Sequence, residues 1–152
     1  MNKVAAEQSL VNILRGSDNC GMGVLALNSR VVTACHCIQD ALATASRIVR
    51  VSKFMNPNLS VDMMVEWYDE NFEIDIAILK PLDSTFHAFE KQLQPAPVQF
   101  SLPEPHHEFD VHLYRRAEGW ATGRSMLIQQ EQQMVEMMSD PVIVVHNSTA
   151  AV

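Results

Sequence analysis

The chain has 152 residues, of which 47% are apolar and 19% are charged, a composition that excludes disorder as its main state. Its length suits one globular domain or two small subdomains that share an interface. The formal net charge of −7 and the scattered basic residues argue against a nucleic acid or an anionic membrane as partner. No apolar run approaches the roughly 18 residues of a membrane span, and the N-terminus lacks the apolar stretch of a secretory signal.

Short β-strands are the first predicted elements. The text "VLALNSRVVTA", residues 24–34, contains two β-prone runs with a turn-like break at "NSR", which predicts a hairpin. Similar runs follow at residues 47–54, 61–68 and 74–81, a spacing of about ten residues. This spacing predicts an antiparallel barrel or sandwich, in which the alanine-rich residues 37–46 form one brief helix.

Prolines mark the middle of the chain. Five of the seven lie between residues 81 and 105, and their missing N–H groups disfavour a regular helix or a central strand. We therefore expect a linker over residues 84–105, between an N-terminal β-barrel at 1–83 and a partial second barrel at 106–152. Strand candidates in the second part are residues 109–116, 120–130 and 141–147, with 129–138 as either a strand or an amphipathic helix.

Two of the three cysteines flank one histidine in "VVTACHCIQD". An odd number of cysteines permits at most one internal disulfide and leaves one thiol over. Three interpretations compete: a metal-binding cluster, a disulfide beside a core histidine, or a catalytic histidine held by a neighbouring bridge. A zinc site would use Cys20, Cys35, His36 and Cys37, but three consecutive ligands do not easily converge on one tetrahedral ion, and the usual gaps between ligands are missing.

Two motifs in the first half resemble those of trypsin-like serine peptidases. "VVTACHC" is similar to their histidine motif, an apolar strand followed by Thr-Ala-small-His-Cys, and "EIDIAILK" is similar to their aspartate motif. The preceding "NCGMGVLAL" resembles the glycine-containing strand entry of the family. His36 and Asp75 are 39 residues apart, a span of several short strands, and the resemblance covers residues 16–81.

The resemblance implies an all-β, chymotrypsin-like double β-barrel, with the first barrel complete, the second incomplete, and one short helix after the histidine. It implies a trypsin-like serine endopeptidase that hydrolyses peptide bonds of a protein or peptide substrate and needs no metal or other cofactor. His36 would take the proton of the serine nucleophile, and Asp75 would fix the histidine tautomer and stabilise the imidazolium. Cys20 and Cys37 would form a disulfide, and Cys35 would be the leftover thiol where the family has a small residue.

The third motif of the family, Gly-Asp/Asn-Ser-Gly-Gly-Pro, is absent. The nearest text is "HNSTAAV", in which Asn147 and Ser148 align with the middle of the motif, so Ser148 is the candidate nucleophile. His146 stands where a glycine normally turns its N–H group into the oxyanion hole. Ser125 in "ATGRSML" also follows a glycine, but it lacks the later glycines and is better interpreted as a strand residue.

Two explanations account for the degraded serine motif. In the first, which we favour, the chain is a fragment and the nucleophile lies beyond Val152. In the second, the chain is a degenerate relative, and its function is that of an inactive pseudo-peptidase that binds a protein or peptide. A small cysteine-ligated metal protein is a third, weaker hypothesis. The family is commonly secreted or periplasmic, whereas this sequence shows no signal peptide, so neither compartment nor oligomeric state is predicted.

Overall fold

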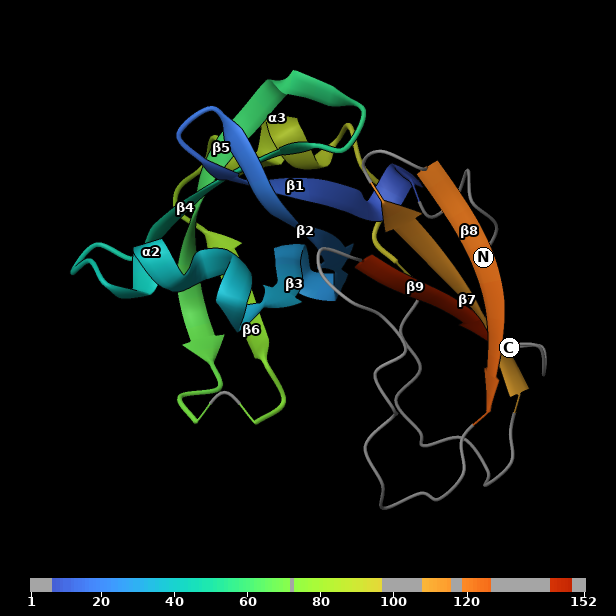
Figure 1. Ribbon diagram of the computed structural model, residues 1–152. Coiled ribbons are helices and arrows are strands. Elements are labelled where there is room, and N and C mark those ends of the chain that lie inside the picture. Colours follow the sequence, from blue (N-terminus) through green and yellow to red (C-terminus); the bar gives the residue numbers. More distant parts are fainter. Residues whose placement is uncertain (1–6, 72, 97–107, 116–118, 127–142, 149–152) are drawn as a thin grey trace. The chain divides into compact units, whose positions relative to one another are not determined.

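The structure is a computed structural model that describes residues 7–71, 73–96, 108–115, 119–126 and 143–148 (Figure 1). The chain divides into two compact units, one formed by Val4–Val98 and the other by Gln99–Val152 with Met1–Lys3. This division falls inside the segment that the prolines predict as a linker. The finer limits at residues 83 and 105 stay predictions.

The first unit contains a closed antiparallel barrel (Figure 1). The strand order is β1-β2-β3-β6-β5-β4, and the barrel closes because β1 pairs with β4 as well as with β2. Closure gives every strand a hydrogen-bonded neighbour on both sides, so the barrel has no exposed sheet edge. Its strands are β1 (Leu10–Arg15), β2 (Asp18–Ala26), β3 (Arg30–Ala34), β4 (Ile48–Lys53), β5 (Asn56–Tyr68) and β6 (Ile76–Pro81).

The strand predictions for the first half are largely confirmed. The hairpin predicted over residues 24–34 is β2 and β3, with Leu25 opposite Val31. Its connection is a 3-10 turn, η1 (Leu27–Ser29), in which Asn28 and Ser29 have φ angles of 61° and 60°. Residues 47–54 and 74–81 contain β4 and β6, and β5 begins earlier than predicted, at Asn56, because its first residues continue the ladder with β4 through a bulge.

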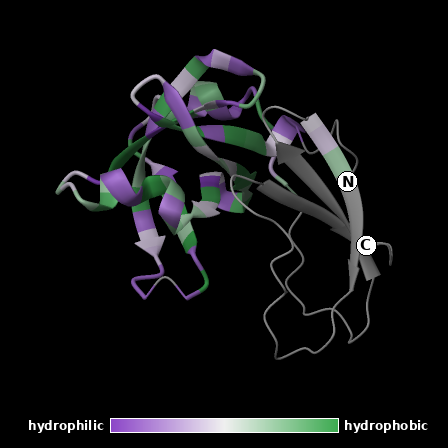
Figure 2. Ribbon diagram, in the orientation of Figure 1, coloured by the Kyte–Doolittle hydropathy of each residue, from purple (hydrophilic) through white to green (hydrophobic). Residues whose placement is uncertain are grey.

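Side-chain alternation across the barrel wall builds the core. In β4, Val49 and Val51 are buried while Ile48 and Arg50 are exposed, and the hydropathy colours of Figure 2 alternate along the barrel strands. Burial of apolar surface contributes roughly 25 cal/mol per Å², so this period of two fixes which face of each strand points inward. The most deeply buried apolar residues of the barrel are Leu10, Val11, Leu25, Val31, Val51, Met63, Ala77 and Leu79.

Strand β1 was not predicted from the sequence, because Asn12 interrupts its apolar run. The Asn12 side chain is nevertheless buried, and its Nδ2 lies 3.1 Å from Ser52 Oγ, 3.2 Å from the Lys53 carbonyl oxygen and 3.3 Å from that of Phe54. Asn19 Nδ2 donates to Asn12 Oδ1 at 2.9 Å. A buried amide whose donor and acceptor are both engaged avoids the desolvation penalty of an unpaired polar group. This amide joins β1 to β4 where the barrel closes.

The helix predicted over residues 37–46 is shorter in the structure. It consists of a 3-10 turn, η2 (Cys35–Ile38), and one α-helical turn, α2 (Gln39–Leu42). The side chain of Thr44 donates to the Ala41 carbonyl oxygen at 2.9 Å and accepts the N–H of Arg47 at 3.3 Å. Threonine side chains that bond to nearby backbone compete with helix continuation, which explains the early end.

The proline-rich segment contains a helix, so the prediction that it holds no regular structure is wrong for its first part. Helix α3 (Phe86–Glu90) lies between Pro81 and Pro95, a stretch without proline in which helical hydrogen bonds are possible. Phe86 and Phe89 are buried, and their ring centroids are 5.7 Å apart. This part of the predicted linker therefore belongs to the core of the first unit.

The second unit contains a three-stranded antiparallel sheet in the order β8-β7-β9. Its strands are β7 (Glu108–Arg115), β8 (Gly119–Met126) and β9 (Ile143–Ser148). They lie where strands were predicted, and Ser125 is a strand residue as expected, whereas residues 129–138 lie outside the described ranges. Within the described parts of the chain, no helix is long and apolar enough to cross a membrane.

Candidate active site

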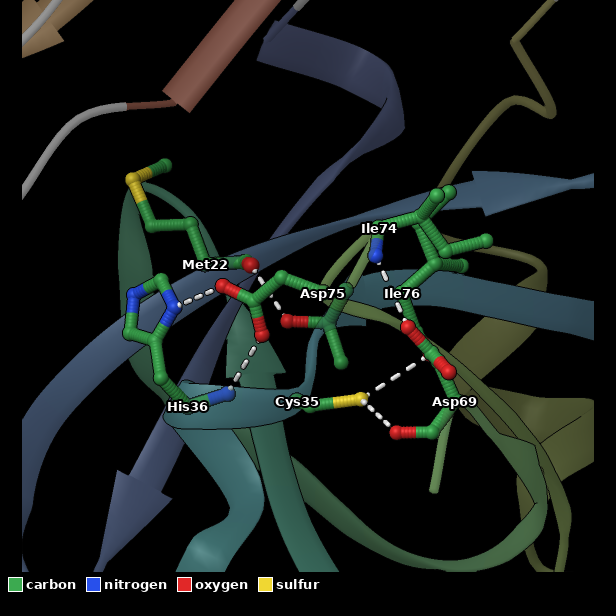
Figure 3. Close-up of polar contacts among 8 residues, drawn as sticks. Met22, Cys35, His36, Asp69, Ile74, Asp75 and Ile76 are labelled. Atoms are coloured by element: carbon green, nitrogen blue, oxygen red, sulfur yellow. Dashed lines mark hydrogen bonds and ion pairs between the residues drawn. The ribbon is translucent and has the colours of Figure 1, made fainter. Parts of the chain in front are cut away.

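His36 lies in the turn that follows β3. Strand β3 alternates buried Val31 and Thr33 with outward residues, and the Thr33 hydroxyl donates to the Met22 carbonyl oxygen on neighbouring β2 at 2.8 Å. The chain then turns into η2, which places the His36 side chain outside the barrel wall (Figure 3). About half of this side chain, 49%, is exposed, so a reacting group from solvent can reach it.

Asp75 lies at the end of the connection between β5 and β6, directly before β6 begins. Its φ angle is 52°, in the left-handed region that residues other than glycine rarely adopt. The Cys35 N–H donates to the Asp75 carbonyl oxygen at 3.1 Å, which attaches this backbone to the turn that carries His36. A residue in such a conformation is held there by its surroundings, and such residues are concentrated at functional sites.

The two predicted residues meet in the structure. Asp75 Oδ2 lies 2.5 Å from His36 Nδ1, and Asp75 Oδ1 accepts the backbone N–H of His36 at 3.0 Å (Figure 3). Because both oxygens of the carboxylate bind the same residue, the imidazole is fixed in rotation and its Nδ1 is assigned as the protonated nitrogen. The other ring nitrogen, Nε2, has no hydrogen-bond partner among the described residues and is available as a base.

The three consecutive side chains of the Cys-His-Cys sequence point to different partners. The Cys35 thiol is buried and donates to the Ile76 carbonyl oxygen at 3.0 Å, His36 faces Asp75, and the Cys37 sulfur packs against Gly21. Side chains that diverge in this way do not supply the tetrahedral ligand set of a structural zinc ion. In the described part of the chain, no group of three His, Cys, Asp or Glu residues is placed to hold a metal ion.

The disulfide predicted between Cys20 and Cys37 is not formed in the structure, where all three cysteines are free thiols. The Cys20 sulfur donates to the carbonyl oxygen of Cys37 at 3.3 Å and is 3.4 Å from that of Ile13, so the thiol is engaged with backbone. Burial raises the pKa of all three thiols, including Cys35. Nucleophilic cysteines have a lowered pKa, so none of these thiols has the environment of a catalytic cysteine.

Ser148 is the last residue of β9 and stands opposite Phe109 in β7. His146 and Asn147 belong to the same strand, where they pair with Val111 and Asp110. An oxyanion hole needs backbone N–H groups that converge on one point, whereas an extended strand directs successive N–H groups to opposite sides. The backbone at Ser148 therefore differs from the turn that the family motif forms.

Asp69 is a site residue that the sequence reasoning missed. It directly follows the last residue of the long strand β5. Its carboxylate accepts the N–H groups of Asn71 at 3.1 Å and of Ile74 at 2.8 Å. The text "YDENFEID" contains the signal, an aspartate that opens a polar turn between two strands. The sequence does not show its role, because Asp69 binds backbone N–H groups rather than another side chain.

Solved structures with a similar fold include proteases. No protein-family model matches the chain, and no curated protein does. The serine endoprotease from Yersinia pestis is 17% identical with a TM-score of 0.53, over 83% of this chain and 42% of that one. The Rv3671c protease of M. tuberculosis is 20% identical with a TM-score of 0.51, over 83% of this chain and 55% of that one.

Kallikrein-related peptidase 10 is similar as well, at 14% identity and a TM-score of 0.52, over 85% of this chain and 61% of that one. At these identities the likeness shows the fold alone. The chain therefore has an all-β, chymotrypsin-like fold whose first barrel is closed, as the resemblance of its motifs implied. It spans between 42% and 61% of the length of these three proteases.

Proposed function

We propose that this chain is a serine endopeptidase domain in which His36 is the general base and Asp75 orients it. One observation carries the proposal: the Asp75 carboxylate contacts both Nδ1 and the backbone N–H of His36, and so leaves Nε2 available. A carboxylate held against Nδ1 is the arrangement that lets a neutral imidazole take a proton at its other nitrogen. The protease fold of the solved structures supports the same function, and the substrate would be a protein or peptide.

The chemistry assigned to these residues is acyl transfer to a serine hydroxyl. His36 Nε2 takes the hydroxyl proton as the serine oxygen bonds to the carbonyl carbon of the peptide, and Asp75 stabilises the resulting imidazolium. The imidazolium then gives this proton to the leaving amine as the carbon–nitrogen bond breaks. A water molecule then gives a proton to His36 as its oxygen bonds to the acyl carbon, and the imidazolium returns this proton to the serine oxygen as the ester carbon–oxygen bond breaks, which releases the acid and regenerates the free serine and the neutral histidine. These reaction steps require no redox change and no cofactor.

Ser148 is the nucleophile that we propose within this sequence. Its support is the alignment of "HNS" with the middle of the family motif and the 73 residues that separate it from Asp75.

The second candidate function is a pseudo-peptidase that binds a peptide without cleaving it. The specific observation in its favour is the strand conformation of His146–Ser148, together with the histidine in place of the oxyanion glycine. Loss of one oxyanion donor lowers turnover by about two to three orders of magnitude. Under this hypothesis the barrel surface around His36 is retained for recognition.

Hydrolysis of a peptide library by the full chain distinguishes the two functions. Cleavage that disappears in His36→Ala and Ser148→Ala, but persists in Ser125→Ala, supports the endopeptidase with Ser148 as nucleophile. Ser125→Ala is the matched control, because it removes a serine hydroxyl from another strand of the same unit. Binding of library peptides that is weakened by His36→Ala, with no cleavage by any variant, would support the pseudo-peptidase instead.

A further inference from the structure

The loop from Asp69 to Asp75 is organised around one exposed carboxylate. Asp69 Oδ1 accepts the N–H of Asn71 at 3.1 Å, and Oδ2 accepts the N–H of Ile74 at 2.8 Å. The Ile74 N–H is the main cause that lowers the pKa of the Asp69 carboxyl, with further contributions from the N–H groups of Asn71, Glu73 and Asp75. One side chain therefore binds backbone along most of the loop.

The two ends of this loop are joined at the start of β6. The backbone N–H of Asp69 donates to the Ile76 carbonyl oxygen at 2.9 Å, and the buried Cys35 thiol donates to the same oxygen at 3.0 Å. Figure 3 shows the sulfur of Cys35 between the backbone of Asp69 and that of Ile76. The loop is thus closed at its base and bound to the turn that carries His36.

Asp75 needs such support because of its backbone conformation. At a φ of 52°, the intrinsic backbone preference of a residue with a Cβ atom does not favour the observed conformation, so neighbouring groups must hold it. The N–H of Ile74, which lies in the peptide unit between Glu73 and Ile74, is held by Asp69 Oδ2, and the N–H of Asp75 itself also contributes to the lowered pKa of Asp69. Release of this backbone would let the Asp75 carboxylate move away from the imidazole.

We propose that Asp69 is a positioning residue, which fixes the loop from Asp69 to Asp75 so that the Asp75 carboxylate meets His36. The carboxylate of Asp69 acts through the backbone, and it is Asp75 that contacts the histidine. The consequence for turnover rests on the proposed function, whereas the consequence for the histidine hydrogen bond does not. Both consequences are measurable in the same set of variants.

The direct readout is the proton NMR signal of the His36 Nδ1 proton in the full chain. Asp75→Asn, which replaces the carboxylate partner, identifies the signal. In Asp69→Ala we expect the signal to be lost through exchange with solvent, and in Asp69→Asn we expect a weakened signal, because the amide oxygen keeps one acceptor. If Asp69→Ala only destabilised the fold, the His36 signal would not depend on whether residue 69 keeps a hydrogen-bond acceptor.

Asp83→Ala is the matched control. Asp83 is also an exposed aspartate that caps a turn, with Oδ1 2.9 Å from the Thr85 N–H and 2.5 Å from the Thr85 hydroxyl, and these bonds likewise lower its pKa. It lies between β6 and α3, away from the loop that carries Asp75. We expect Asp83→Ala to keep the His36 signal, and circular dichroism verifies that each variant is folded.

The kinetic readout separates this inference from the proposed function. If the wild-type chain cleaves peptide, Asp69→Ala should lower kcat by about 10²-fold, the effect of a displacement near 1 Å, with KM little changed. If Asp69→Ala keeps the wild-type His36 signal and the wild-type kcat, the positioning role is wrong, whereas the proposed endopeptidase function is not contradicted. Absence of cleavage in every variant, with the His36 signal lost only in the Asp69 and Asp75 variants, would contradict the endopeptidase and retain the inference.

Discussion

The histidine corner and the serine segment of this molecule differ in how their conformations are determined. His36, Asp75 and Asp69 lie in connections between strands of one closed barrel, and the hydrogen bonds that join them in the described part of the chain come from residues of those connections. Ser148 lies in the other unit, at the end of a strand that pairs regularly with β7. The conformation of the proposed base is thus set within the first unit, whereas that of Ser148 is set by strand pairing within the second.

This difference shows that a sequence motif predicts local structure well where the same residues are needed both for the proposed chemistry and for the fold. The apolar run before His36 is at once the β3 strand of the barrel and the support of the histidine turn. The aspartate motif does the same for β6, whose first residues follow Asp75 directly. The serine segment satisfies the demands of a strand but lacks the glycines that a catalytic turn requires.

The largest effect that sharpens this comparison is expected for Asp75→Asn. The amide keeps the size of the side chain but no longer stabilises the imidazolium and favours the wrong tautomer, so peptide cleavage should fall by about 10⁴-fold. Steady-state kinetics measure this loss. Asp62→Asn, on β5 and paired with Arg50 on the barrel surface, is the control and should retain wild-type turnover. Equal losses in both variants would contradict a specific role for Asp75.

Gly21→Ala should disturb the histidine corner through packing. A Cβ atom at Gly21 would lie 2.3 Å from the sulfur and 2.8 Å from the Cβ atom of Cys37, the residue next to His36. Overpacking of this kind costs about 1–3 kcal/mol, measured by urea unfolding. Combining it with Cys37→Gly removes both clashing atoms and should recover part of the loss. Additive destabilisation of the two changes would contradict the contact.

Asn12→Ala should weaken the closure of the barrel. It removes the amide that reaches Ser52 and the carbonyl groups of Lys53 and Phe54, and it leaves buried polar groups without their partner. Such a loss costs about 1–3 kcal/mol. Thermal unfolding measures it, with Asn56→Ala at the exposed start of β5 as the control. Asn12→Ala stability equal to that of the control would show that the amide network contributes nothing.

The smallest expected effect is an alkaline loss of stability. Burial raises the pKa of the Cys20 and Cys37 thiols in the folded chain above that in the unfolded chain. Their contribution to stability is therefore fully present below the unfolded thiol pKa and is lost as pH rises through the raised folded value. Melting temperatures from about pH 7 to about pH 10 should fall less steeply in a Cys20→Ala/Cys37→Ala variant. Parallel curves would contradict this linkage.

The sequence predicted the elements whose patterns are direct. Alternating apolar runs located β2 to β6, and the two motifs located His36 and Asp75. Strand β1 was not predicted, because the polar residue Asn12 interrupts its apolar pattern. The hydrogen bonds that allow this amide to be buried depend on residues distant in the sequence, so the sequence pattern does not show them. Helix α3 was not predicted because a count of prolines over a long segment ignores the gap between Pro81 and Pro95.

The supporting groups of the site were harder to predict than its principal residues. The disulfide between Cys20 and Cys37 followed from the family resemblance, but a sequence does not fix the direction in which the Cys20 sulfur points, and the structure directs it at backbone. Asp69 acts through backbone N–H groups, which every residue carries, so no motif identifies it. Such partners depend on the path of the loop rather than on residue type.

Reaction of the full chain with a fluorophosphonate probe tests the central claim most directly. This reagent forms a covalent bond with a serine whose hydroxyl is activated by a neighbouring base, and peptide mass spectrometry locates the bond. We expect stoichiometric labelling of Ser148 in the wild-type chain and none in His36→Ala or Asp75→Ala. Failure of the wild-type chain to react, or labelling that persists without His36, would contradict the proposal that these residues form a serine-peptidase site.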